Sequence, residues 1–304
     1  MMGAAGAGAA WSWNPANDIT QMLSYHFMVN ALRSGTIIGV TAGAIGWFMI
    51  LRRQSFAGHT LAVVAFPGAA GAIWLGLPLT LGYFGFCLGT ALIIAGASLG
   101  RAGGGFFEES AVTATAQAFA LASGFLFVTL YRGFLGGLTG LLFGNLLGIS
   151  DTQVLVLLLV AALALAVLAV IGRPLFFATI DPAVAAARGV PVRALSVVFL
   201  LLLGAAAAEV SQITGALLVF ALLVMPAAAA QQLTVRPVLS LALTVLIGLA
   251  VTWTGIGAAY FSVYPVGFFV TTIGFAVYLA AVAARRLTDL RARGRRGAAL
   301  VLGV

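Results

Sequence analysis

The sequence contains no lysine and little charge of any kind. All 15 of its basic residues are arginines, and only 7% of its 304 residues are charged, whereas soluble domains average about 25%. A nucleotide-binding P-loop requires a lysine in its G-x-x-x-x-G-K-[ST] motif, so this chain cannot hold ATP in that way. Any use of ATP must therefore come from a partner protein.

Residues that bind metals or form disulfides are also scarce. The chain has one cysteine, Cys87, and two histidines, so no intrachain disulfide can form. A zinc site usually takes three or four protein ligands, and this composition offers few. The sequence also lacks the H-E-x-x-H and G-x-S-x-G motifs of hydrolases. We therefore expect neither an enzyme nor a cofactor held by the chain itself.

Apolar residues make up most of the sequence. They account for 62% of the chain, and the mean hydropathy is +1.15, which is typical of a protein embedded in lipid. We divide the chain into a flexible N-terminal segment (1–22), one transmembrane domain (23–285) and a basic cytoplasmic tail (286–304). The first segment lacks the basic start of a signal peptide.

The apolar runs predict a bundle of about nine transmembrane helices, since a span needs about 20 apolar residues. The runs are Phe27–Leu51, Thr60–Leu77, Leu79–Leu99, Ser110–Leu130, Thr152–Ile171, Leu195–Ala208, Glu209–Ala230, Val238–Phe261 and Val266–Ala284. The first run carries glycines at 35, 39 and 43 on one helical face, which allows another helix to approach closely. Residues 136–150 repeat glycine every four positions and form either a re-entrant or interfacial helix or an extension of the next span.

The arginines predict the orientation of the bundle. With the N-terminus outside and the C-terminus inside, 13 of the 15 arginines fall on the cytoplasmic side, and the reverse orientation would place two there. These arginines lie in loops, where they meet anionic lipid head groups, so the net charge of +8 is no argument for nucleic acid. The predicted fold is an all-α integral membrane protein.

Polar residues interrupt the sixth and seventh apolar runs, which together are slightly short for two spans. Glu209, Gln212 and Thr214 lie at their junction, and Pro226 is expected to end the second run. Unpaired polar groups are costly in hydrocarbon. We interpret this hairpin as the lining of a solute pathway. The alternative is a tight turn whose polar residues cap the helix ends.

A short helix is predicted on the cytoplasmic side, between the fifth and sixth runs. Asp181 is a good N-cap, Pro182 suits the first turn, and Gly189 ends the helix, which contains Ala185. Such a well-capped helix is either a docking site for a soluble partner or an ordinary interfacial loop helix.

The two histidines lie close to the starts of the first two apolar runs. His59 is either a metal ligand, because imidazole suits zinc and other first-row ions, or a structural or interfacial residue. His26 and Arg33 lie near the start of the first run, where we expect them to reach toward the membrane interface.

Several segments in order resemble one known family. The chain resembles the integral-membrane permease subunits of bacterial ATP-binding-cassette (ABC) importers for zinc, manganese or iron, the ABC-3 family, over roughly residues 23–285. The matching stretches are LSYHFMVNALRSG, ILRRQSFAGHTLAVVAFPGAAGA, LLFGNLLGIS, FATIDPAVAAARGVPVR and QITGALLVFALLVMPAAAA. Gln212, Gly215 and Pro226 fit the family pattern.

The resemblance implies an assembly in the bacterial cytoplasmic membrane. It would comprise two permease subunits as a homodimer, two cytosolic ATPase subunits that bind ATP, and an extracytoplasmic metal-binding protein. The loop at Asp181–Val190 would be the element that couples to the ATPase. The transported ligand would be a divalent metal.

One departure from the family concerns the metal path. Members usually read G-D-x-L-x-H after the first span, where this chain has His59 in place of the acid and Val63 in place of the histidine. We hypothesise that His59 from each of two subunits faces a shared axis, with Glu209 supplying charge elsewhere. Other hypotheses are an importer for a metal chelate, a secondary transporter or channel that needs no ATPase, and a structural scaffold.

Overall fold

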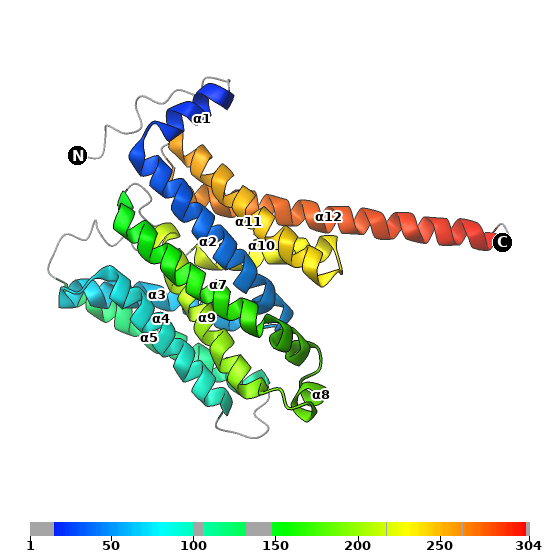
Figure 1. Cartoon of the computed structure of the whole chain (residues 1–304), viewed down its shortest axis with the longest axis horizontal. Coiled ribbons are helices and arrows are strands. Elements are labelled where there is room, and N and C mark those ends of the chain that lie inside the picture. Colours follow the sequence, from blue (N-terminus) through cyan, green and yellow to red (C-terminus); the bar gives the residue numbers. More distant parts are fainter. Residues whose placement is uncertain (1–14, 100–105, 132–147, 217, 263, 302–304) are drawn as a thin grey trace.

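The computed structural model describes residues 15–99, 106–131, 148–216, 218–262 and 264–301, and its regular elements in these ranges are all helices. Figure 1 shows them in chain order. They are α1 (Pro15–Leu23), α2 (His26–Leu51), α3 (Ser55–Leu75), α4 (Leu79–Leu99), α5 (Phe106–Leu130), α7 (Asp151–Ile180), α8 (Pro182–Ala187), α9 (Val192–Thr214), α10 (Val219–Leu233), α11 (Pro237–Tyr260) and α12 (Val266–Val301).

The prediction of a helical membrane bundle is confirmed. Eight of the described helices are long and apolar enough to cross a membrane, and α10 is a ninth apolar helix of 15 residues. In lipid every backbone polar group must be satisfied internally, which is why such apolar runs fold as helices. At 1.5 Å per residue α10 is about 22 Å long, which is less than the hydrocarbon core of about 30 Å.

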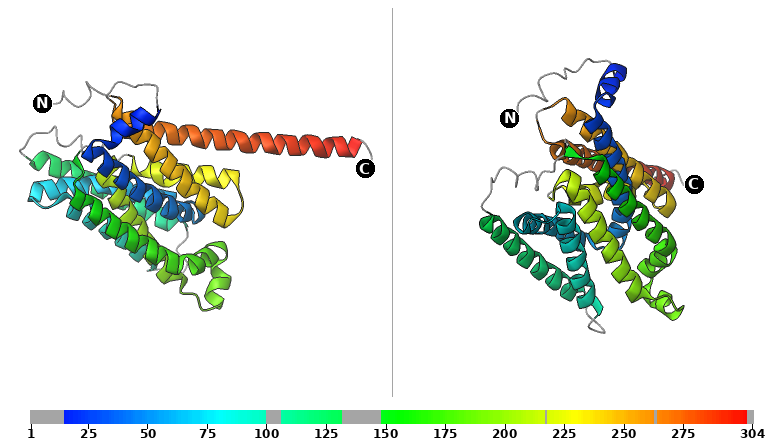
Figure 2. Two further views of the ribbon diagram at one scale, coloured as in Figure 1. Left: turned by 45° about the horizontal axis from the view of Figure 1, so that its top comes forward. Right: turned by 60° about the vertical axis from the view of Figure 1, so that its left-hand side comes forward.

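The helices form three neighbouring groups. Helices α3, α4 and α5 pack together on one side, α10, α11 and α12 on the other, and α2, α7 and α9 lie between them. Helix α1 lies at the opposite end of the bundle from α8, and the C-terminal half of α12 extends beyond the rest (Figures 1 and 2).

Glycines on α2 set its distance from α11, as the sequence predicts. A Cβ at Gly43 would lie 3.1 Å from the Cα of Val245, and one at Gly39 would lie 3.5 Å from the Cα of Leu249. A Cβ at Gly46 would overlap the backbone carbonyl oxygen of Leu223 on α10. Helix α2 therefore packs backbone to backbone against two other helices.

The prediction that Pro226 ends the seventh run is wrong, and the helix of the fifth run is longer than the predicted Thr152–Ile171. Helix α7 continues through Pro174 to Ile180, and α10 continues through Pro226 to Leu233. Pro226 is buried, and its Cγ lies 3.8 Å from the Cβ position of Gly248 on α11. Membrane helices tolerate proline where neighbouring helices enclose the interrupted backbone.

The predicted junction at Glu209 is also displaced. Helix α9 runs through Glu209 to Thr214, where Gly215 with φ +77° follows it, and α10 begins at Val219. Helix α3 begins at Ser55, so His59 lies within its first turns rather than before the span. Of the proposed re-entrant segment 136–150, residues 136–147 lie outside the described residues.

Candidate functional site

Glu209 is a buried carboxylate inside the helix bundle. Its exposure is 0%, and within the described residues neither carboxylate oxygen has a hydrogen-bond partner. Helix α9 packs against α2, α3, α4 and α7. An unpaired acid in such surroundings is costly and usually marks a functional position in a membrane protein.

Gln212 lies one turn from Glu209 on the same helix and joins α9 to α4. Its Oε1 accepts a hydrogen bond from Thr80 Oγ1 at 3.2 Å, and its Nε2 donates to the Ala208 carbonyl at 3.4 Å. Thr214 is buried and donates to the Val210 carbonyl at 3.1 Å. Thr214 is therefore satisfied within its own helix, whereas Gln212 bridges two helices.

His59 comes from a different helix pair. Its ring lies edge-on to Phe220 of α10, with 5.1 Å between centroids. The next residue, Thr60, is buried and donates to Gln117 Oε1 of α5 at 2.8 Å. Among the described residues no hydrogen bond or ring contact joins His59 to Glu209, Gln212 or Thr214. The structure thus places His59 on α3 against α10, and Gln212 on α9 bonded to α4.

A complete metal site is not gathered within one copy of the described chain. In those residues no group of three or more His, Cys, Asp or Glu side chains is placed to hold a metal ion. His59 as a metal ligand therefore stays a prediction that needs donors from elsewhere.

The short helix α8 has the predicted caps. The Asp181 Oδ1 accepts a hydrogen bond from the Val184 amide at 2.9 Å, and Pro182 occupies the first turn. Ala185 is fully buried against the bundle, while Val184 is 44% exposed. Gly189 follows with φ +79° in the left-handed region. These features give a fixed, largely exposed helix at the ends of α7 and α9.

Sequence reasoning missed the role of Arg52, which was counted only as a topology signal. Its Nη1 donates to Thr179 Oγ1 at 3.3 Å, and its Nη2 donates to Ser196 Oγ at 2.8 Å. Its guanidinium also lies 5.3 Å from the ring centroid of Phe199. Thr179 and Ser196 flank the α8 segment, so Arg52 ties both of its ends to α2. Only the fold brings these distant residues together.

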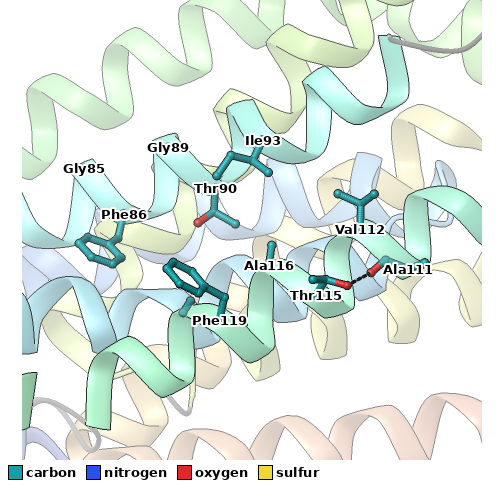
Figure 3. Close-up of a pocket in the computed structure, with 11 residues that line it drawn as sticks. Gly85, Phe86, Gly89, Thr90, Ile93, Ala111, Val112, Thr115, Ala116 and Phe119 are labelled. Atoms are coloured by element: carbon teal, nitrogen blue, oxygen red, sulfur yellow. Dashed lines mark hydrogen bonds between the residues drawn. The ribbon is translucent and has the colours of Figure 1, made fainter. Parts of the chain in front are cut away.

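An apolar groove of about 620 Å³ lies between α4 and α5 (Figure 3). Glycine, alanine and phenylalanine residues line most of it. The Thr115 hydroxyl in its wall donates to the Ala111 carbonyl at 2.8 Å. None of the predicted pathway residues lines this groove. The lining of this groove suits contact with apolar groups rather than binding of an ion.

Comparison with known proteins identifies the family. A family model described as the ABC 3 transport family matches residues 24–285. The chain belongs to the ABC 3 transport family. It is accordingly a multi-pass protein of the bacterial cytoplasmic membrane.

Two curated ABC 3 relatives are named for manganese. The manganese transport system membrane protein MntC of Halalkalibacterium halodurans is 33% identical over 175 residues, which are 58% of this chain and 59% of the relative. The manganese import system permease protein ScaB of Streptococcus gordonii is 32% identical over 171 residues, 55% and 59% of the two chains. The matches thus span about three-fifths of each relative's length.

A solved structure extends the likeness to nearly the whole chain. The structure titled PsaBC from Streptococcus pneumoniae in complex with Fab superposes with a TM-score of 0.78 at 25% identity. It covers 91% of this chain and 99% of the other. The bundle therefore has the architecture of that solved structure.

Proposed function

We propose that this chain is the permease subunit of an ABC importer that takes up a divalent transition metal, with manganese ahead of zinc and iron. The family match over residues 24–285 carries the proposal. The manganese-named relatives support the choice of ion.

The energy for transport comes from a partner. The permease itself has no lysine for a P-loop, so ATP binds to two cytosolic ATPase subunits. Helix α8 docks on them through Asp181, Pro182, Ala185 and Gly189, and Arg52 carries its displacement to α2. An extracytoplasmic metal-binding protein delivers the ion to a homodimer of permeases.

The ion path uses few ligands. His59 of each copy faces the shared axis, and Glu209, Gln212 and Thr214 line the path farther along. Conduction requires contacts that are weak enough to release the ion, so a sparse set of donors is suited to transport. Glu209 supplies a carboxyl group as a ligand inside the bundle, where it is fully buried.

The proposal is tested in a manganese-uptake-deficient bacterial strain that expresses this chain with its ATPase and binding protein. We expect manganese accumulation to recover, and His59→Ala to reduce the recovery. Excess zinc or iron should compete if either shares the path. Recovery by an iron chelate but not by free manganese would favour a chelate importer, and manganese uptake without the ATPase would favour a secondary transporter or channel.

A further inference from the structure

A histidine, an aspartate and an asparagine from two helices meet at one end of the bundle. His26 and Asn30 lie one turn apart at the start of α2, and Asp151 opens α7. This is the end of the bundle that the arginine distribution assigns to the outer face. The sequence analysis treated His26 as an interfacial residue and did not connect it with Asp151, because 125 positions separate them.

The contacts in this cluster are short and converge on one carboxylate. His26 Nε2 lies 3.0 Å from Asp151 Oδ2, and Asn30 Nδ2 donates to Asp151 Oδ1 at 3.0 Å. Asn30 Nδ2 also donates to the Ile149 carbonyl at 3.2 Å. The His26 and Asp151 side chains are 71% and 66% exposed, so an ion from the outer solution can reach them.

The side-chain carbonyl oxygen of Asn30 is available as a metal ligand. The residue is 1% exposed, and within the described residues its Oδ1 has no hydrogen-bond partner. Its Nδ2 bonds to Asp151, so the side chain that carries this oxygen is in contact with the His26–Asp151 pair. A buried carbonyl oxygen of this kind is an acceptor without a cation or a donor to satisfy it.

The donor set suits a divalent metal. Metal bonds to imidazole nitrogen and carboxylate oxygen are about 2.0–2.2 Å long, so two neighbouring ligands at a right angle lie about 3.0 Å apart. The nitrogen–oxygen separation of His26 and Asp151 has this value. Carboxylate and carbonyl oxygens favour manganese, and imidazole also accepts zinc and iron. Binding would displace the proton that the pair shares.

We propose that His26, Asp151 and Asn30 form an outer binding station for a divalent transition metal, separate from His59. The proposal rests on the importer function, because it supplies a place where an arriving ion is first held. Arg33 lies close enough for its charge to act on Asp151. That positive charge weakens the binding of a cation, so the station can release its ion inward.

A polar stripe continues from this station along α2. Asn30, Ser34 and Thr41 recur at helical spacing, and all three are buried. At its outer end the stripe meets α7 through the hydrogen bond from Asn30 to Asp151.

The unpaired atoms of the bundle are confined to this region and to α9. Among the described residues the buried side-chain oxygens without a partner belong to Asn30, Ser34 and Glu209 only. Helices α2 and α9 pack against each other. The helix that carries the stripe is therefore a neighbour of the helix that carries Glu209.

The test measures binding of manganese alone to the purified full chain in lipid nanodiscs by electron paramagnetic resonance. Wild type should bind Mn²⁺ with nitrogen coupling in the pulsed spectrum. His26→Ala should remove that coupling, and His26→Ala and Asp151→Asn should each weaken binding about tenfold or more. Asn at position 151 can still accept the bond from Asn30, so the contact between α2 and α7 is retained.

The control is Asp289→Asn, which removes an exposed carboxylate on α12 far along the chain and should leave binding unchanged. Unchanged affinity in both station variants would overturn the proposal, and so would nitrogen coupling that persists in His26→Ala. Uptake by the complete transporter is measured in parallel. If the station variants bind Mn²⁺ as wild type does and the transporter carrying them takes up manganese normally, the station is refuted and the importer function stands. Station-dependent binding without any uptake refutes the importer function alone.

Discussion

Arg52 shows how one side chain can join parts of the molecule that lie far apart in the sequence. It reaches Thr179 at the end of α7 and Ser196 at the start of α9, the two residues that bracket the α8 segment. It also lies over the ring of Phe199. A planar guanidinium can hold two hydroxyls and an aromatic face at once, which a lysine ammonium cannot. In the proposed importer, a displacement of α8 would reach α2 through this residue.

Replacing Arg52 by alanine should uncouple transport from ATP hydrolysis. The variant loses the tie between α2 and the two ends of the α8 segment, while the apolar bundle stays assembled. We expect transport per ATP hydrolysed to fall roughly two- to thirtyfold, or about 0.5–2 kcal/mol of coupling. The measurement is the ratio of manganese uptake to phosphate release in proteoliposomes. A ratio equal to wild type would show that Arg52 only sets topology.

Glu209 is expected to lower the stability of the bundle and to be needed for transport. Its carboxylate is fully buried and unpaired in the described structure, and a buried group without a partner costs about 1–3 kcal/mol, more when it is charged. Glu209→Leu should therefore raise the melting temperature by a few degrees, and both Glu209→Leu and Glu209→Gln should lower uptake. Thermal unfolding of the purified variants and uptake by the complex are the two measurements. Lower stability with unchanged uptake would make Glu209 a structural residue.

At the scale of single elements, α8 depends on the turn that ends it. Gly189 has φ +79°, a conformation that costs an ordinary residue about 1–2 kcal/mol. Gly189→Val should displace α8 and abolish coupled uptake, while membrane insertion and the melting temperature stay close to wild type. Gly189→Asn is the matched control, because asparagine tolerates this conformation, and it should retain most of the activity. Normal uptake by the valine variant would count against the docking role.

The contact between α2 and α10 offers a second test at this scale. A methyl group at Gly46 would overlap the Leu223 carbonyl oxygen, whereas one at Gly89 would meet nothing within 4 Å. Gly46→Ala should therefore destabilise the bundle by about 1–3 kcal/mol, and Gly89→Ala should be neutral or slightly stabilising. The melting temperatures of the two variants in detergent give the comparison. Equal values would mean that α10 does not pack on α2 as closely as described.

For the molecule as a whole, the sequence predicted the layout of the bundle but not its internal contacts. Long apolar runs must fold as helices in lipid, so spans such as Leu79–Leu99 were predicted with the observed ends. The Asp181 cap and the Gly189 stop were likewise readable, because capping depends on neighbouring residues. Pro226 misled the prediction, since the cost of a proline within a helix depends on the surrounding helices rather than on local sequence.

Contacts between distant residues could not be predicted in the same way. The order of the apolar runs along the sequence does not say which helices are neighbours. It therefore could not predict three contacts between helices: His26 with Asp151, Arg52 with Ser196 and Gln212 with Thr80. The displacement of the α9–α10 break from Glu209 to Gly215 has a similar cause. Helix α9 gains burial on several sides and so continues through its polar residues.

The most direct test reconstitutes the purified chain in liposomes with and without its ATPase subunit and ATP. The account predicts manganese uptake, in the presence of the metal-binding protein, only when both the ATPase and ATP are supplied. It also predicts that a non-hydrolysable ATP analogue does not support continued uptake. Full uptake by the chain alone would contradict the central claim that its transport is driven by a partner through α8.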